Sequence, residues 1–198
     1  MAFWGENLSA GTAQDPKRKF RFKVLFGGNT AASGETANQV VWWAKGVDKP
    51  KMTVNGSEHK FMGHTFKYPG SVKWEDINVT LVDPASPDAA QQTLEIMALA
   101  GYVFPEAGYV DGSTRAMNTM NKAKAAAAVG TFQITQIDAD GNDVETWTLH
   151  NPYFSAVNFS ELSYDSDDLS EIQLTVVYDW ARLTTEGADY KFKLPGQQ

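Results

Sequence analysis

Residues 151–183 read NPYFSAVNFSELSYDSDDLSEIQLTVVYDWARL. Apolar side chains occupy every even position from residue 172 to residue 180, and this period of two predicts a half-buried β-strand. Residues 157–164 also have strand character, and an acidic run at residues 165–168 separates the two segments. We therefore predict two strands joined by a charged turn, which form the spine of a sheet. The alternation places four side chains in the core: Ile172, Leu174, Val176 and Trp180.

The bulk composition indicates a globular protein with one sizeable core. Of the 198 residues, 42% are hydrophobic and 12% are aromatic, which suits a single packed domain. The net charge of -7 would repel nucleic acid, so a DNA-reading function is disfavoured. The chain has no cysteine, which excludes disulfides, thiolate metal sites and cysteine nucleophiles. It also has no apolar stretch of about 20 residues and no signal-like N-terminus, so no membrane span and synthesis in a cytoplasm are expected.

The predicted domain covers residues 17–183, between an N-terminal arm, residues 1–16, and a polar tail, residues 184–198. Its first strand should contain alternating basic and apolar residues, with Phe20 and Phe22 on the core side. The opposite, basic face is interpreted as solvated or facing a partner, in preference to a phosphate-binding track.

The segment that follows combines a long polar loop with a strongly apolar run. Residues 27–38 are rich in glycine and small polar residues, and a loop of this length in a compact domain usually reaches toward another surface. Residues 40–43 read VVWW, which in a strand would be apolar on both faces. Such a strand is expected in the core or against another subunit.

Turn signals and a change of phase predict two further hairpins. The Asn55–Gly56 pair predicts a long hairpin with its tip near Asn55, and the turn at residues 140–142 predicts another. Between residues 71 and 82 the apolar positions change from even, with Trp74 in the core, to odd. A β-bulge near Glu75 and Asp76 would correct the register.

One helix has clear boundary signals. Ser86 is the expected N-cap, Pro87 and Asp88 suit the first turn, and Gly101 is the expected C′ residue. A second helical segment is predicted within the alanine-rich residues 113–129. The first helix should bury a stripe at helical spacing: Ala90, Leu94, Met97 and Ala98.

No arrangement of residues points to catalysis, so no catalytic, cofactor or metal site is predicted and the protein is not expected to be an enzyme. His59 and His64 would point to opposite faces of a strand and cannot share a metal. The run at residues 138–142 has the spacing of a calcium loop but lacks its glycine and its final glutamate, so a hairpin turn is the better interpretation. A solvated turn is likewise preferred to a cation site for residues 165–168.

Several segments in succession resemble the tail tube protein of contractile-tailed bacteriophages. They are FRFKVLFGG, VVWWAKGVDKPKMTV, GHTFKYPGSVKWEDINVTLVDP followed by a helix, and the C-terminal stretch quoted above. The resemblance covers most of residues 17–183, while residues 27–38 and 113–129 do not align with it.

The resemblance implies a mainly β protein, an antiparallel sandwich or barrel-like subunit with one helix. It implies hexameric rings that stack into a hollow tube, with the inner sheets of neighbours joined into one continuous barrel. The implied partners are other copies of the chain, the tail sheath, baseplate and tail terminator proteins, and genomic DNA that passes without sequence-specific binding. The implied location is the virion tail, after synthesis in the host cytoplasm, and no cofactor is implied.

Two sets of interface candidates follow from this resemblance. The predicted ring-stacking residues are Phe3, Trp4, Asn29, Thr30, Ser33, Glu35, Lys51, Asn55 and Ser57. The predicted lateral contacts between subunits are Trp42, Trp43, Asp165, Asp167 and Asp168.

Alternative functions remain open at the level of sequence. A secretion-system tube, a phage-like bacteriocin tube or a baseplate ring protein would give the same patterns. A different class of protein, a monomeric β-barrel, could bind a small apolar ligand through four tryptophans: Trp42, Trp43, Trp74 and Trp147.

Overall fold

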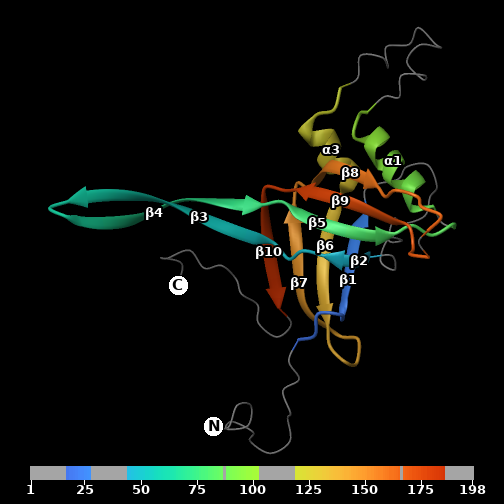
Figure 1. Cartoon of the computed structure of the whole chain (residues 1–198), viewed down its shortest axis with the longest axis horizontal. Helices are drawn as coiled ribbons and strands as arrows, with labels where there is room; N and C mark the ends of the chain where they lie inside the picture. The colour runs from blue at the N-terminus through green and yellow to red at the C-terminus, as the bar shows by residue number, and fades with distance from the viewer. Residues whose placement is uncertain (1–16, 28–43, 87, 103–118, 166, 186–198) are drawn as a thin grey trace, which may run out of the picture.

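The computed structural model describes residues 17–27, 44–86, 88–102, 119–165 and 167–185 (Figure 1). The predicted N-terminal arm and most of the predicted loop at residues 27–38 therefore lie outside the described residues. The same is true of eight predicted contact residues: Phe3, Trp4, Asn29, Thr30, Ser33, Glu35, Trp42 and Trp43.

The described chain forms two four-stranded antiparallel sheets, a separate two-stranded ribbon and two helices. In the first sheet the order is β1 (Phe22–Gly27), β6 (Thr131–Ile137), β7 (Asp143–His150) and β10 (Trp180–Thr185). In the second sheet the order is β2 (Ala44–Val47), β5 (Ile77–Val82), β9 (Glu171–Val177) and β8 (Tyr153–Phe159). Among the described strands neither sheet closes on itself, so the fold is an antiparallel sandwich and not a closed barrel.

The core lies between the two sheets and is filled by the alternating residues of their facing sides. Ile172, Leu174 and Val176 of β9 are each at most 1% exposed, as their alternation predicts. From the first sheet, Phe26 stacks on Phe132 with 5.5 Å between ring centroids. The ring of Phe154, from β8, lies perpendicular to that of Phe26 with 5.9 Å between centroids, so aromatic packing joins the two sheets.

The even-position stripe does not form one continuous strand. β9 ends at Val177, and β10 begins at Trp180 in the other sheet, so the chain crosses between sheets at residues 178–179. Trp180 is 45% exposed and stacks on His150 with 3.6 Å between ring centroids. The prediction that Trp180 is a core residue is wrong, because the crossing resets the phase and the neighbouring Ala181 is buried in its place.

Asp179 stabilises this crossing through hydrogen bonds of its backbone and of its carboxylate. Its backbone N–H donates to the carbonyl of His150 over 3.0 Å, which ties β10 to the end of β7. Its carboxylate accepts hydrogen bonds from Lys122 at 2.6 Å and from the Asn151 amide at 2.8 Å. The bonds from Lys122 and Asn151 hold the pKa of Asp179 below its ordinary value. The chain also passes between the sheets at residues 151–152, from β7 to β8, so this one carboxylate joins both crossings to the helix that begins at Lys122.

The first strand is shorter than predicted. β1 begins at Phe22, which is half-buried and packs against the core, whereas Phe20 lies in a turn before the strand and is 75% exposed. The prediction that Phe20 is a core residue is therefore wrong. Its ring lies 5.4 Å from the guanidinium carbon of Arg21, outside the space between the sheets.

Two helices, α1 (Ala89–Leu99) and α3 (Lys122–Val129), pack together at one end of the sandwich (Figure 1). The N-cap of α1 is Asp88 and not Ser86, because the Asp88 carboxylate accepts from the Gln91 N–H at 3.0 Å. Gly101, with φ of 107°, follows the C-cap as predicted. The buried face is Ala89, Thr93 and Ile96, one position from the predicted stripe, so Leu94 is 38% exposed and the prediction that it is a core residue is wrong.

The β6–β7 hairpin confirms the turn predicted at residues 140–142. The Asp138 carboxylate accepts from the backbone N–H groups of Asp140 and Asn142, each at 2.8 Å, and from the Asn142 side chain at 3.0 Å. These bonds, the one from the Asn142 side chain foremost, lower the pKa of Asp138. The carboxylate that suggested a calcium loop is used within the turn.

Candidate assembly surfaces

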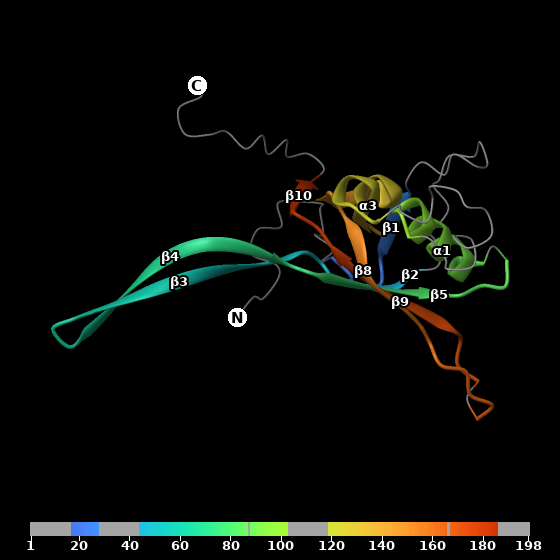
Figure 2. The same cartoon turned by 90° about the horizontal axis from the view of Figure 1, so that it is seen from above.

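The most prominent surface feature is a long hairpin formed by β3 (Lys51–Phe61) and β4 (His64–Glu75). Figures 1 and 2 both show it extending away from the sandwich, with no other labelled element along most of its length. Every residue of β3 is exposed, and so is β4 until its last two residues. Within the described residues, this ribbon therefore has no core along most of its length.

The tip of the hairpin is at Met62–Gly63 and not near Asn55. Met62 and Gly63 have positive φ angles of 46° and 81°, as a tight two-residue turn requires. Asn55–Gly56 instead lies opposite a β-bulge in β4, where the register shifts between Val54 and Gly56. The strands are very close here, because a Cβ on Gly70 would lie 2.9 Å from the carbonyl oxygen of Asn55.

The hairpin continues out of the second sheet. β2 leads into β3 and β4 leads into β5, and the chain breaks its strand geometry at Asp76. This is where the apolar phase was predicted to change, although the break separates two sheets and is not a bulge within one. At the hairpin base Lys51 pairs with Glu75 at 2.8 Å, and Trp74 packs 6.0 Å from the ring of Tyr178. Hydrogen bonds from Lys51 and Thr53 lower the pKa of Glu75.

A buried carboxylate fixes the segments that approach the first sheet. Glu145 of β7 is 7% exposed and forms ion pairs with Lys17 and with Lys49, which precedes β3. Lys49 also donates to the side-chain carbonyl of Gln136 at 2.7 Å. Burial alone would raise the pKa of Glu145, but the bonds from Lys17 and Lys49 outweigh it and the pKa is lowered. The base of the hairpin is therefore held by these ion pairs as well as by its continuity with the second sheet.

Large apolar side chains are unusually exposed along the hairpin. An isolated two-stranded ribbon is marginally stable in water, and contiguous exposed apolar surface marks interaction sites. Seven of its large apolar residues are between 48% and 83% exposed: Met52, Val54, Phe61, Met62, Phe66, Tyr68 and Val72.

A second projection is the tip of the β8–β9 hairpin, which also leaves the body in Figure 2. β8 and β9 pair as predicted, and the acidic turn lies at their tip. Asp165, Asp167 and Asp168 are exposed there. They lie beside Leu162 and Tyr164, which are 89% and 109% exposed.

The predicted contact residues within the described chain thus fall on two projections. Lys51, Asn55 and Ser57 all lie on the β3–β4 hairpin, at its base, at the bulge and beyond it. Sequence reasoning missed the apolar residues of the same hairpin, although strands this rich in apolar residues, paired only with each other, could have indicated them.

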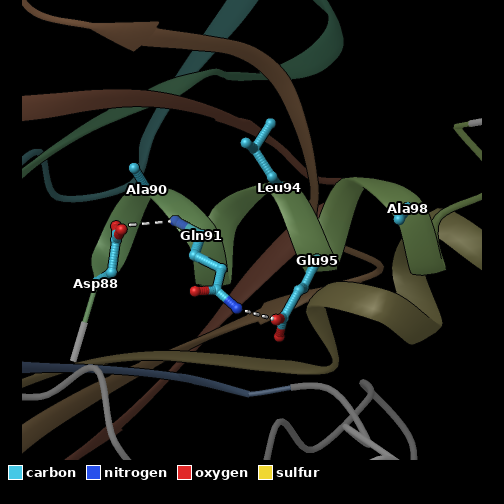
Figure 3. Close-up of a pocket in the computed structure, with 6 residues that line it drawn as sticks. All are labelled: Asp88, Ala90, Gln91, Leu94, Glu95 and Ala98. Atoms are coloured by element: carbon cyan, nitrogen blue, oxygen red, sulfur yellow. Dashed lines mark hydrogen bonds between the residues drawn. The ribbon is translucent and has the colours of Figure 1, made fainter. Parts of the chain in front are cut away.

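A hollow of about 490 Å³ lies on the outer side of α1 (Figure 3). It is lined by Asp88, Ala90, Gln91, Leu94, Glu95 and Ala98, all from the start or the body of one helix. None of these residues is a tryptophan, so this hollow does not correspond to the tryptophan-lined ligand site considered above. In the described part of the chain, no helix is long and apolar enough to cross a membrane.

Comparison of the sequence with protein-family models gives no match, and comparison with curated proteins gives none either. Solved structures do match. The chain superposes on the tube-terminating cap of the anti-feeding prophage with a TM-score of 0.60 and 15% identity, covering 91% of this chain and 99% of that one.

Two chains of PVC, an extracellular contractile injection system, match with TM-scores of 0.59. One is from the sheath/tube terminator, with 15% identity, 88% of this chain and 100% of that chain covered. The other is from the sheath-tube complex, with 13% identity, 87% of this chain and 93% of that chain covered. The chain therefore has the tail tube fold, and the fold expected from the resemblance is confirmed.

Proposed function

We propose that this protein is a structural subunit of the inner tube of a contractile phage tail or a related injection apparatus, and not an enzyme. One observation carries the proposal: a chain with the tail tube fold extends a hairpin whose apolar side chains its own body leaves uncovered. Burying these residues against other copies of the chain would stabilise both the hairpin and the assembly.

The geometry of the assembly follows from the sheets and the hairpin. Among the described strands, β1 and β10 end the first sheet, and β2 and β8 end the second, so each sheet offers edges for pairing with a neighbour. Closing a ring of six subunits would remove such edges, and head-to-tail contacts between rings would extend the assembly into a tube. The hairpin is the proposed ring-to-ring contact, and the acidic tip of β8–β9 is a proposed lateral contact.

The proposed partners are a contractile sheath outside the tube, a baseplate at one end and a terminator at the other. The proposed site of the protein is the tail of a virion or injection particle, after synthesis in the host cytoplasm. A subunit with a net charge of -7 suits a tube through which DNA moves without being held, because phosphates would not find a continuous basic surface.

A second candidate within the same assembly is the terminator itself. Two of the matched structures are a tube-terminating cap and a sheath/tube terminator, and this chain covers 99% and 100% of them. A terminator should form a closed ring but should not extend into a filament without a tube beneath it.

Negative-stain electron microscopy and sedimentation velocity of the purified protein, over a range of concentrations, test both candidates. Stacked rings or tubes whose length grows with concentration support the tube subunit. Single rings that do not stack support the terminator. A monomer at the highest concentration would refute both and would favour a binding protein.

A further inference from the structure

The two halves of the β3–β4 hairpin carry their apolar side chains on different faces. In the half near the body, here called the base half, Met52 pairs with Trp74 and Val54 pairs with Val72. Directly paired residues lie on the same face of a two-stranded ribbon, so these four form one apolar face. The intervening Thr53 pairs with Lys73 on the other, polar face of this half.

The half beyond the bulge, here called the tip half, shows the opposite pattern. Ser57 pairs with Tyr68, His59 pairs with Phe66, and Phe61 pairs with His64, which gives an aromatic face. The other face of the tip half is charged. It carries Glu58 and Lys67, paired across the strands with 3.6 Å between their charged atoms, together with Lys60 and Thr65.

The bulge places these two apolar faces on opposite sides of the ribbon. Between the pairs Val54–Val72 and Gly56–Pro69, β3 advances by two residues and β4 by three, so β4 holds the extra residue. β3 keeps its period of two, so its even residues, Met52 and Val54, lie opposite its odd residues, such as Phe61. If β4 kept a strict period of two through this stretch, its even residues Phe66 and Tyr68 would fall on the same face as Trp74 and Met52.

We propose that the hairpin joins two different neighbouring copies of this chain, one on the apolar face of the base half and another on the aromatic face of the tip half. This inference rests on the proposed function. Each half spans about five residues, or roughly 17 Å, which is enough for a separate contact. The two faces belong to opposite sides of the ribbon and to different halves of it, so a surface seated on one of them does not cover the other.

The distribution of charge along the chain supports other copies of this chain as the binding partners of both apolar faces. The hairpin, residues 51–75, contains four lysines and two glutamates and so carries +2. Subtracting this from the net charge of -7 leaves -9 on the rest of the chain. A basic hairpin is therefore attracted to the acidic body of any other copy, while its apolar faces supply the contact surface.

Photo-crosslinking within the assembled protein tests the proposal. A chain that carries both Val54→p-benzoylphenylalanine and Tyr68→p-benzoylphenylalanine is assembled with a large excess of unlabelled chain and irradiated. We expect covalent trimers of one labelled and two unlabelled chains. The matched control carries its two labels at Met52 and Val54, on one face of one half, and should give dimers with at least a fivefold smaller share of trimers.

The outcomes separate the inference from the proposed function. Rings or tubes that give only dimers from the Val54 and Tyr68 pair, or that give no adducts, overturn the two-copy hairpin and leave the tube function standing. A protein that forms no assembly in micrographs refutes the proposed function, and the inference with it.

Removing the bulge supplies a second test, in which the same two labels are used and only the faces that carry them change. Insertion of one serine between Asn55 and Gly56 gives β3 a partner for the extra residue of β4, so both strands keep a period of two and Tyr68 should move to the face that carries Val54. In a variant with unchanged circular dichroism, the trimer share should fall to that of the control or assembly should stop. An unchanged share of trimers would overturn the assignment of the two sides to the bulge.

Discussion

Replacing the aromatic residues of the tip half should weaken assembly without weakening the fold. Phe66 and Tyr68 are 48% and 53% exposed in the single chain. A full aromatic side chain buries about 150–250 Å², so each of these leaves roughly 100 Å² for a neighbour to cover. At about 25 cal/mol per Å², the pair contributes on the order of 5 kcal/mol to one contact. The double variant Phe66→Ser, Tyr68→Ser should therefore raise the concentration needed for assembly by at least about 10²-fold, since each 1.4 kcal/mol is a factor of ten. This is less than 5 kcal/mol would give, because the entropy lost in ordering the side chains offsets part of the gain from buried area.

The assay is a pelleting measurement of the concentration at which assemblies first appear, with micrographs of each sample. A melting curve of the unassembled protein should show no loss of stability, because neither ring belongs to the core. Leu94→Ser is the matched control, since Leu94 is also a partly exposed apolar residue but lies on α1, away from the hairpin. An unchanged assembly threshold for the double variant, or an equal increase for Leu94→Ser, would refute the role given to the hairpin.

Four further variants, in three comparisons, test the fold that holds the hairpin. Phe132→Ala should lower the free energy of unfolding in urea by about 3–5 kcal/mol, because Phe132 is fully buried. Phe20→Ala should change that free energy by less than about 0.5 kcal/mol, because Phe20 is exposed. Equal losses would contradict the assignment of Phe132 to the core. Glu145→Gln should cost about 1–3 kcal/mol, since Lys17 and Lys49 lose their buried partner, and an unchanged unfolding midpoint would show that this network is dispensable. Because the pKa of Asp179 is lowered in the folded protein, its contribution is present above its ordinary pKa and is lost as pH falls through the lowered one. The melting temperature of the native chain should therefore fall more steeply below about pH 4 than that of Asp179→Asn, and parallel curves would exclude this carboxylate as a source of acid sensitivity.

Contacts at the base of the hairpin fix the direction in which the exposed ribbon leaves the sandwich. Lys49, immediately before β3, is held by the buried Glu145, and Trp74, at the end of β4, packs on Tyr178. Both strands are thus fixed where they leave the body, and only the part beyond lacks such contacts in the described chain.

Local sequence signals were most reliable where one short stretch determines the geometry. The Asp138–Asn142 turn and the glycine after α1 follow from residues that favour a specific backbone conformation, and both are found where predicted. Asn55–Gly56 shows the limit of such signals, because the same pair suits a turn and can also lie within a strand opposite a bulge. The strands beyond it continue to pair for five more residues, and that pairing decides between the two.

By itself the sequence determined that residues 172–176 alternate in and out, that the chain is a mainly β antiparallel protein with a helix ending before Gly101, and that no thiol chemistry is possible. The sequence could not determine which face of each strand packs against another part of the chain. A period of two shows which side chains share a face, and only packing between distant segments decides whether that face is a core or a surface. This is why Trp180, with the phase of a core residue, is exposed where the chain crosses between sheets, and why the apolar side chains of the hairpin beyond Trp74 remain exposed in the described part of the chain.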